Sequence, residues 1–242
     1  MQITTSDDVR TLGTILAVGA HPDDETFTAG GLLATATANG QQVICVTATR
    51  GEAGSQDEDR WPAAALGNIR AAELQAAFTI LGIQSHHWLG YADGQLAAVP
   101  VNEAAAKISK IVEQYQPDSI LTFGPDGLTG HPDHQAVSAW AQAAVQGRSG
   151  PRVYHVVVNP DDYEQQLRKL DEQLDIFFAT DKPPLVPPTQ CAIAYRLTPG
   201  ALAKKWQALA AMPSQYEKLL ALVPERARHS VLSAEYFVLA SA

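Results

Sequence analysis

The sequence predicts an α/β fold, in the form of a three-layer α/β/α sandwich around a Rossmann-like, mostly parallel sheet. Two observations predict it. Short apolar runs rich in β-branched residues alternate along the chain with longer amphipathic stretches, an order typical of strand–helix–strand units. Polar clusters directly follow several of the apolar runs, and the carboxyl ends of parallel strands are where such sheets carry their sites. A chain of 242 residues is long enough for one large domain of this kind.

The first part of the chain predicts four strand–helix repeats. A strand is predicted where a short run is apolar, as in TILAVGA at residues 14–20, and a helix where apolar residues recur at helical spacing before a Gly or Pro. By these criteria the expected strands are residues 14–20, 42–49, 86–89 and 119–123, the expected helices are residues 27–39, 63–81, 101–115 and 134–146, and residues 50–62 form a polar loop.

After about residue 150 the pattern is less regular. The expected elements are a strand at residues 153–158, a charged helix at 163–174, a rigid connector or lid with four prolines at 181–189, a strand at 191–197, and helices at 199–212 and 214–222. The chain shows no internal repeat and no low-complexity tail. We therefore expect residues 1–242 to form a single domain, whose more irregular C-terminal third, about residues 150–242, shapes the substrate pocket.

Composition excludes several partner classes. Lys and Arg number 17 and Asp and Glu 26, a net charge of −9, whereas binding to nucleic acid or to an anionic membrane needs clustered Lys and Arg. The N-terminus lacks the basic cluster of a signal peptide, and no run approaches the roughly 18 apolar residues of a membrane helix. Cys45 and Cys191 are too few for a disulfide scaffold. We expect a cytoplasmic protein with neither nucleic acid nor membrane as partner.

Two strings rich in His and Asp carry the chemistry: His21-Pro22-Asp23-Asp24-Glu25 and His131-Pro132-Asp133-His134. Imidazole and carboxylate are the ligands of a borderline divalent ion, Zn²⁺ above all, although another divalent cation is not excluded by this donor set. A catalytic zinc site takes three protein ligands and an open position for water. One His and one Asp of the first string and one His of the second can supply them.

The remaining polar residues of the two strings have expected roles of their own. Successive side chains diverge at a strand-to-helix turn, so one of Asp23 and Asp24 is expected to bind the ion and the other to act as general base. His134 is expected to ligate, and His131 to stabilise a developing oxyanion in its protonated form. Asp133 is expected to orient one of these imidazoles.

Two other interpretations of the same strings are less well supported by the sequence. An isolated His-Pro-Asp-Asp string is compatible with an ordinary helix N-cap, since Asp and Pro are both favoured there. A second string of the same kind after another predicted strand disfavours that interpretation. A nucleotide-dependent oxidoreductase is disfavoured too, because the turn after the first strand holds acidic residues and no G-x-G-x-x-G motif.

The two strings, read as Ala20-His21-Pro22-Asp23-Asp24-Glu25 and Gly130-His131-Pro132-Asp133-His134, resemble the signature motifs of the PIG-L/LmbE-like deacetylases. These zinc-dependent enzymes remove acetyl groups from N-acetylglucosamine units of small conjugates. The resemblance covers roughly residues 13–145. It is also carried by Thr49-Arg50-Gly51-Glu52-Ala53-Gly54, Arg70, Ala72, Glu73, Leu81, Gly82, Gly90-Tyr91, Asp93-Gly94 and Asp126-Gly127.

The resemblance implies a role for each matching residue. The metal ligands would be His21, Asp24 and His134, and the general base Asp23. His131 would stabilise the oxyanion with support from Asp133, and Arg50 would hold the sugar or its aglycone. Near the C-terminus, Met212 stands where the family often has a His, which leaves open whether this position contacts metal or substrate. Glu235-Tyr236-Phe237 resembles a typical family ending.

The function expected is therefore that of a metal-dependent hydrolase that cleaves a linear amide C–N bond, releasing acetate from an N-acetylglucosaminyl conjugate. The alternative is a catalytically inactive metal- or sugar-binding protein of the same fold. Release of acetate from N-acetyl sugars separates the two. The sequence does not indicate the aglycone, the metal loaded in the cell, or whether the chain forms a homo-oligomer.

Overall fold

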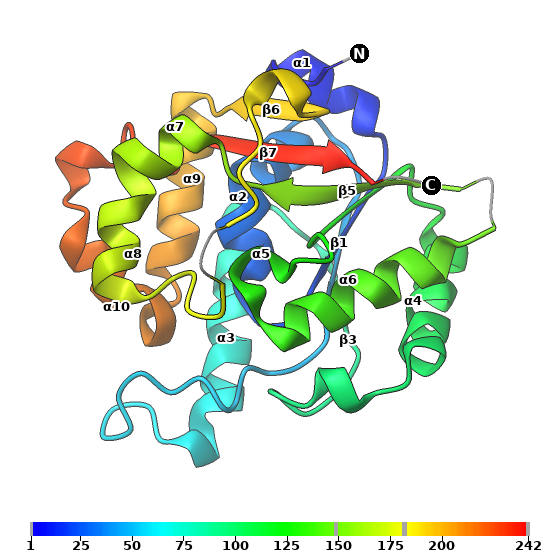
Figure 1. Cartoon of the computed structure of the whole chain (residues 1–242), viewed down its shortest axis with the longest axis horizontal. Helices are drawn as coiled ribbons and strands as arrows, with labels where there is room; N and C mark the ends of the chain where they lie inside the picture. Colours follow the sequence, from blue (N-terminus) through cyan, green and yellow to red (C-terminus); the bar gives the residue numbers. More distant parts are fainter. Residues whose placement is uncertain (1, 148–149, 181–182, 241–242) are drawn as a thin grey trace.

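A computed structural model describes residues 2–147, 150–180 and 183–240 (Figure 1). Within these residues the strands form a seven-stranded sheet in the order β3-β2-β1-β4-β5-β7-β6. The strands are β1 (Ile15–Gly19), β2 (Val43–Thr47), β3 (Ser85–Trp88), β4 (Ser119–Thr122), β5 (Arg152–Val157), β6 (Ile193–Arg196) and β7 (Ala234–Leu239). β1 to β5 are parallel, and β7 runs antiparallel to both β5 and β6.

Helices cover both faces of the sheet, which confirms the predicted three-layer α/β/α sandwich. On one face α2, α3 and α9 pack together, and α4 and α6 pack against each other on the other face (Figure 1). The longer helices are α2 (Asp24–Ala38), α3 (Ala63–Leu81), α4 (Val101–Tyr115), α6 (Pro132–Val145), α8 (Arg168–Leu174), α9 (Pro199–Ala210) and α10 (Pro213–Leu222). The short helices are α1 (Ser6–Val9), α5 (Gly127–Gly130) and α7 (Pro160–Asp162).

The central strands explain why the sequence reads as unbroken apolar runs. Every residue of β1 and β2 is buried, because helices cover both faces of a parallel sheet and leave no solvated side for polar residues. β1 pairs with β2 from Ile15 opposite Val43 to Gly19 opposite Thr47, and with β4 on its other side. This register brings the carboxyl ends of neighbouring strands, and the turns that follow them, to one edge of the sheet.

The C-terminal third belongs to the same sheet. β7 is inserted between β5 and β6, and an isolated bridge joins Ile3 to Ile193, so the N-terminal residues also extend this edge. The expected helix at residues 163–174 is instead interrupted: residues Tyr163–Leu167 are π-helical before α8 begins. In the expected proline-rich connector, residues 181–182 lie outside the described residues, and Pro188–Gln190 form a short 3₁₀ turn.

β7 was not predicted from the sequence. Its residues include Glu235, a charged residue that interrupts the apolar pattern expected of a buried strand. The side chain of Glu235 is nevertheless only 2 % exposed. Among the described residues, no helix is both long enough and apolar enough to span a membrane.

Candidate active site

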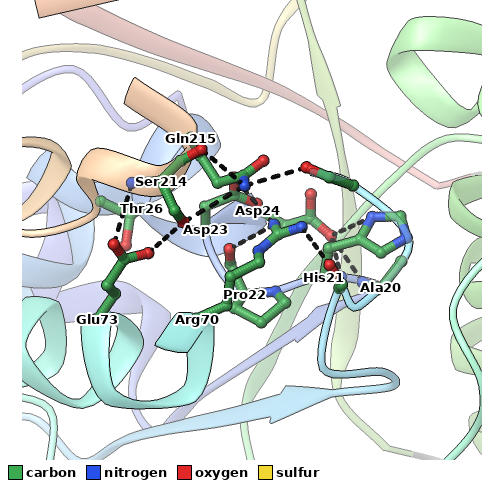
Figure 2. Close-up of polar contacts among 12 residues, drawn as sticks. Ala20, His21, Pro22, Asp23, Asp24, Thr26, Arg70, Glu73, Ser214 and Gln215 are labelled. Atoms are coloured by element: carbon green, nitrogen blue, oxygen red, sulfur yellow. Dashed lines mark hydrogen bonds and ion pairs between the residues drawn. The ribbon is translucent and has the colours of Figure 1, made fainter. Parts of the chain in front are cut away.

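The first polar cluster lies in the turn from β1 into α2. Asp23 precedes the helix with a backbone φ of 134°, a conformation that residues with a side chain rarely adopt. The Asp24 carboxylate folds back into the turn, where its Oδ2 accepts hydrogen bonds from the backbone N–H of Ala20 at 2.7 Å and of His21 at 2.8 Å (Figure 2). The turn therefore directs two adjacent carboxylates to different neighbours.

The second cluster lies at the start of α6, in the connection from β4. His131 is the N-cap residue, and its Nδ1 accepts a hydrogen bond from the backbone N–H of Asp133 at 3.0 Å. In the first turn of the helix, His134 Nδ1 lies 3.0 Å from the carbonyl oxygen of Gly127, to which it donates. The His134 ring also stacks on Phe123, with centroids 4.0 Å apart. Both imidazoles are thus held in fixed orientations.

Three donor atoms from the two clusters converge on one point. His21 Nδ1 lies 3.2 Å from His134 Nε2, and the Asp24 carboxylate lies 3.5 Å from His134 Nε2 and 4.0 Å from His21 Nδ1. Bonds of about 2.0 to 2.2 Å in a tetrahedral zinc site place ligand atoms roughly 3.3 to 3.6 Å apart. The spacing of these three atoms, all on buried side chains, therefore fits a single divalent ion.

The charged groups around His21 favour the same conclusion. His21 Nε2 lies 2.9 Å from Asp93 Oδ1 and 3.4 Å from Asp133 Oδ2, within ion-pair distance of both carboxylates, while Nδ1 faces His134. Burial opposes a charge on His21, but Asp133 and Asp93 outweigh it and raise its pKa to about 10. The point between His21 and His134 thus attracts positive charge, and a divalent cation can replace the proton there.

A second group of possible metal ligands is less suited to an ion. It consists of His21, His131 and Asp133. The two Asp133 oxygens accept hydrogen bonds from the backbone N–H groups of Gly94 at 2.8 Å and Leu96 at 3.1 Å. His131 Nδ1 is engaged as well, by the backbone N–H of Asp133. Both Asp133 oxygens and His131 Nδ1 are thus already engaged by the backbone, whereas His21 Nδ1 and His134 Nε2 face each other, so the first group is the better candidate.

Asp23 stands beside the candidate metal centre and is paired with Arg70. This arginine of α3 is 5 % exposed; its Nη2 lies 3.4 Å from Asp23 Oδ2 and donates to the carbonyl oxygen of Pro22 at 3.0 Å (Figure 2). Its Nη1 donates to the carbonyl oxygen of Gly51. Burial raises the pKa of Asp23, while Arg70 opposes that shift. The carboxyl is therefore poised to exchange a proton near neutral pH.

Asp93 is a site residue to which the sequence assigned no role. It follows β3 in a turn that the sequence singled out only by its resemblance, and its Oδ2 accepts a hydrogen bond from the backbone N–H of Ala53. Burial raises its pKa, but the contact with His21 prevails and the pKa falls to about 2. Asp93 is thus an anion beside a candidate ligand, the arrangement that fixes a ligating imidazole.

Asp133 and His131 lie in the cluster, with contacts that differ in detail from those expected. The Asp133 side chain contacts His21, and it is the Asp133 backbone N–H that bonds His131. Burial, and next the charge of His21, lower the pKa of His131, so its surroundings disfavour the protonated form expected from the sequence. With Nδ1 acting as acceptor, the neutral ring carries its proton on Nε2 and remains a hydrogen-bond donor.

Arg50 and Met212 lie away from the metal-centre cleft. Arg50 is exposed and lies over the Trp88 ring, 5.1 Å from its centroid, and it lines a separate shallow pocket. The cations that line the cleft are Arg70 and Lys218. Met212 is 1 % exposed and packs in the hydrophobic core, so this position offers no ligand.

A cleft of about 700 Å³ lies over the candidate metal centre. It is lined by residues from the region before residue 150 and by residues of the C-terminal third. The His and Asp side chains described above form its polar side. The C-terminal third contributes residues 173–176, Phe178 and residues 215–216 and 218–219. α10 is fixed by the Glu73 carboxylate of α3, which accepts from the backbone N–H of Ser214 at 3.0 Å (Figure 2). Residues of the C-terminal third therefore line the cleft over the candidate metal centre.

Similarity to known proteins agrees with this geometry. The model of the PIG-L family, described as GlcNAc-PI de-N-acetylase, matches residues 16–145, more than half of the chain. A 1D-myo-inositol 2-acetamido-2-deoxy-alpha-D-glucopyranoside deacetylase of Mycolicibacterium gilvum is 32 % identical over 77 % of this chain and 75 % of its own length. Its counterpart in Mycobacterium sp. strain KMS is 34 % identical over 60 % of this chain, and the match spans only 54 % of that relative.

Solved structures show the same fold. An N,N'-diacetylchitobiose deacetylase from Pyrococcus horikoshii superposes with a TM-score of 0.62 at 23 % identity, covering 94 % of this chain and 83 % of that one. The region matched by the family model, residues 16–145, contains both His/Asp strings, all three candidate metal ligands and Arg70. Because the family model matches more than half of the chain, and because the M. gilvum relative is similar over about three quarters of both chains, this chain belongs to the PIG-L family.

Proposed function

We propose that the protein is a zinc-dependent hydrolase that removes the N-acetyl group from an N-acetylglucosaminyl conjugate and releases acetate. The observation that carries the proposal is the convergence of His21, Asp24 and His134 within ligand distance, with the carboxyl of Asp23 beside them in one cleft. Family membership supports it, as do relatives named as deacetylases of an inositol glycoside of N-acetylglucosamine.

His21 Nδ1, an Asp24 oxygen and His134 Nε2 are the atoms that would hold the ion. Two nitrogens and one oxygen are a donor set that zinc shares with other divalent ions, so the choice of zinc belongs to the proposal. When bound, a divalent ion supplies Lewis acidity, which polarises an amide carbonyl and acidifies water.

Asp23 is proposed to move the proton. Its carboxylate accepts a proton from the attacking water and returns it to the nitrogen of the amide as the C–N bond breaks. The products are acetate and a free amine, and the net reaction consumes one water. Arg70 holds the carboxylate, and it opposes the rise in pKa caused by burial, so that Asp23 remains available as a base.

His131 is proposed to stabilise the charge that develops on the acetamide oxygen. Its Nδ1 is engaged by the backbone, so the Nε2–H is the donor left for the oxyanion. Asp93 and Asp133 flank His21 and fix the orientation of that imidazole. Arg50 lines another pocket, so the proposal assigns contact with the sugar to Arg70 and the walls of the metal-centre cleft.

Acetate release from a panel of N-acetylglucosaminides by the zinc-loaded protein tests the proposal. We expect turnover that stops on chelation and returns when zinc is added. Binding of zinc and sugar without release of acetate would instead establish the alternative, a catalytically inactive binding protein.

We also propose a cytoplasmic location and a small-molecule partner rather than a nucleic acid. The net charge of −9 and two buried free cysteines, Cys45 and Cys191, support both parts. A homo-oligomer stays a prediction that measurement of the mass in solution decides.

A further inference from the structure

Phe178 is an exposed aromatic residue on the wall of the metal-centre cleft. Its exposed fraction of 56 % is the largest among the large apolar side chains of the described residues. Its ring meets the His131 ring edge-on, with centroids 5.5 Å apart and an interplanar angle of 88°. An apolar ring that remains open to solvent beside a proposed oxyanion donor is well placed to contact whatever is attached to the reacting sugar.

The segment that carries Phe178 is fixed against the second cluster. The backbone N–H of Ala179 donates to the carbonyl oxygen of Thr129 at 3.2 Å. Gly130 has a φ of 78°, and a Cβ on it would lie 2.2 Å from the carbonyl oxygen of Ala179, so only glycine permits this approach. On the other side of Phe178, the buried Phe177 donates its N–H to Asp171 at 2.8 Å.

Further apolar side chains continue the wall on which Phe178 lies. Leu174 and Ile176 come from the same segment, Leu219 from α10 and Leu128 from the turn before His131. Leu128 has a φ of 62°, a value that costs free energy for a residue with a side chain and is kept where its surroundings impose it. The cleft therefore has a polar side at the candidate metal centre, where the acetamide is proposed to react, and an apolar side to which the C-terminal third contributes most of the residues.

The apolar side is poorly matched to a polyol. Hydroxyl groups that leave water need partners, and the side chains of Phe178, Leu174 and Ile176 offer none. The C-terminal third also brings polar side chains to the cleft, namely Gln173, Asp175, Gln215, Tyr216 and Lys218. An aryl or alkyl group, by contrast, gains free energy from every apolar contact that it makes with this wall.

We propose that the group attached to the N-acetylglucosamine is apolar, an aryl or alkyl aglycone, and that it is held by the wall of Phe178, Leu174 and Ile176. The inference rests on the proposed function and deepens it by naming the class of substrate. It also distinguishes this chain from the relatives named as deacetylases of an inositol glycoside, since inositol is a polyol.

The test compares glycosides that differ only in the aglycone. Methyl, phenyl, octyl and myo-inositol N-acetylglucosaminides are given to the zinc-loaded protein and acetate release is followed. We expect kcat/KM to be about tenfold or more higher for the phenyl and octyl glycosides than for the methyl glycoside. In parallel, titration calorimetry with the corresponding free-amine glycosides measures binding without turnover, and the same preference is expected there.

Two substitutions locate the effect. Phe178→Ser removes an exposed ring, so the fold is expected to persist; it should lower kcat/KM and affinity for the phenyl glycoside about tenfold while changing those for the methyl glycoside less than about twofold. Phe178→Leu should retain most of the preference for the octyl glycoside. Leu222→Ser is the matched control, because Leu222 is also exposed, at 39 %, and does not line the cleft.

Each outcome decides a separate point. Equal constants for the methyl and phenyl glycosides, or a preference for the inositol glycoside, would overturn the inference. So would a loss in Phe178→Ser that is the same for every glycoside, since the ring would then act on the acetamide or on the fold. An aglycone preference in the calorimetry without any acetate release would uphold the apolar wall and refute the deacetylase proposal.

Discussion

Asp23 shows how two adjacent carboxylates acquire different chemistry. Asp24 is held by two backbone N–H groups of its own turn, whereas Asp23 has no such cap and faces the guanidinium of Arg70. The backbone φ of 134° at Asp23 separates the two side chains. Because one carboxylate is fixed towards the histidines and the other is free to exchange a proton, they are not interchangeable in the proposed mechanism.

Replacing Asp23 with Asn should abolish proton transfer while leaving the metal site intact. The amide keeps the shape of the carboxylate but cannot accept the proton, so kcat should fall by about a hundredfold to ten-thousandfold. Acetate release measures this, and elemental analysis should find unchanged zinc. Asp59→Asn, at an exposed carboxylate of the loop before α3, is the control and should keep full activity. Turnover near that of the wild type in Asp23→Asn would refute the role of general base.

The two histidines of the second cluster should separate metal binding from catalysis. His134→Ala removes a donor atom that lies 3.2 Å from His21 Nδ1, so zinc content should fall well below one ion per chain. His131→Ala removes only the proposed oxyanion donor and should keep zinc, with kcat about a hundredfold to a thousandfold lower. Equal zinc content in both variants would contradict the assignment of His134 as a ligand.

The site was predictable from the sequence to the extent that its residues are contiguous. His21, Asp24, His131 and His134 lie in two short strings after predicted strands, so the placement of these strings could be inferred without a structure. Arg70 and Asp93 reach the site from α3 and from the turn after β3. Nothing local to either residue reveals a distant partner, which is why the sequence singled out Arg50 and assigned no role to Arg70.

Among the elements, α2, α9 and β7 are joined by a buried ion pair. Lys205 of α9 and Glu235 of β7 are 1 % and 2 % exposed, and Nζ lies 2.7 Å from Oε1. The same carboxylate accepts hydrogen bonds from the backbone N–H groups of Gly31 and Leu32 in α2. One carboxylate thus links three elements that lie far apart in the sequence.

Glu235→Ala should destabilise the protein strongly. The substitution leaves Lys205 buried without its counter-ion and removes the acceptor of two backbone N–H groups, so the free energy of unfolding should fall by about 3 to 5 kcal/mol. Urea unfolding measures the loss. The double variant Lys205→Met/Glu235→Gln removes both charges and should recover a large part of the stability. If Glu235→Ala unfolds at the same urea concentration as the wild type, the ion pair does not hold these elements together.

The elements were predictable where local periodicity determines them. β1, β2, α3 and α4 appear within a few residues of their expected bounds, because buried runs and helical spacing are visible in the sequence alone. β7 was not, since it contains a charged residue whose partner comes from α9. The π-helical residues Tyr163–Leu167 likewise interrupt a stretch that reads as one helix.

In the whole molecule, strands that are distant in the sequence are neighbours in the sheet, and this arrangement assembles the candidate site. The parallel strands β1 and β4 are neighbours in the sheet although about 100 residues separate them, and their carboxyl ends bring the two His/Asp strings together. The chain between β5 and β7 supplies the residues of the C-terminal third that line the cleft, and β7 then pairs antiparallel with β5. The general fold therefore fixes the reacting groups, and the C-terminal third sets what surrounds them.

The stability of the whole molecule should depend on pH through His86 on β3. Its Nε2 lies 3.0 Å from Thr47 Oγ1 and its ring packs edge-on against Phe78 and Trp88. Burial, with smaller contributions from the nearby charges of His87 and Arg50, lowers its pKa to about 4. The unfolded chain regains the ordinary value of 6.5.

Below about pH 6.5, His86 is therefore protonated in the unfolded chain. In the folded chain His86 stays neutral until the pH falls to about 4. The stabilisation from neutral His86 is complete above pH 6.5 and is lost as the pH falls through this window. We expect the free energy of unfolding to fall by about 1 to 2 kcal/mol from this group, allowing for its partial exposure.

Urea unfolding of the wild type and of His86→Gln at several pH values, both with chelator, isolates the contribution of His86. Gln cannot titrate but can still form a hydrogen bond with Thr47. His229→Gln, at an exposed histidine, is the control. If the wild type and His86→Gln lose stability in parallel between about pH 7 and pH 4, His86 does not carry the effect.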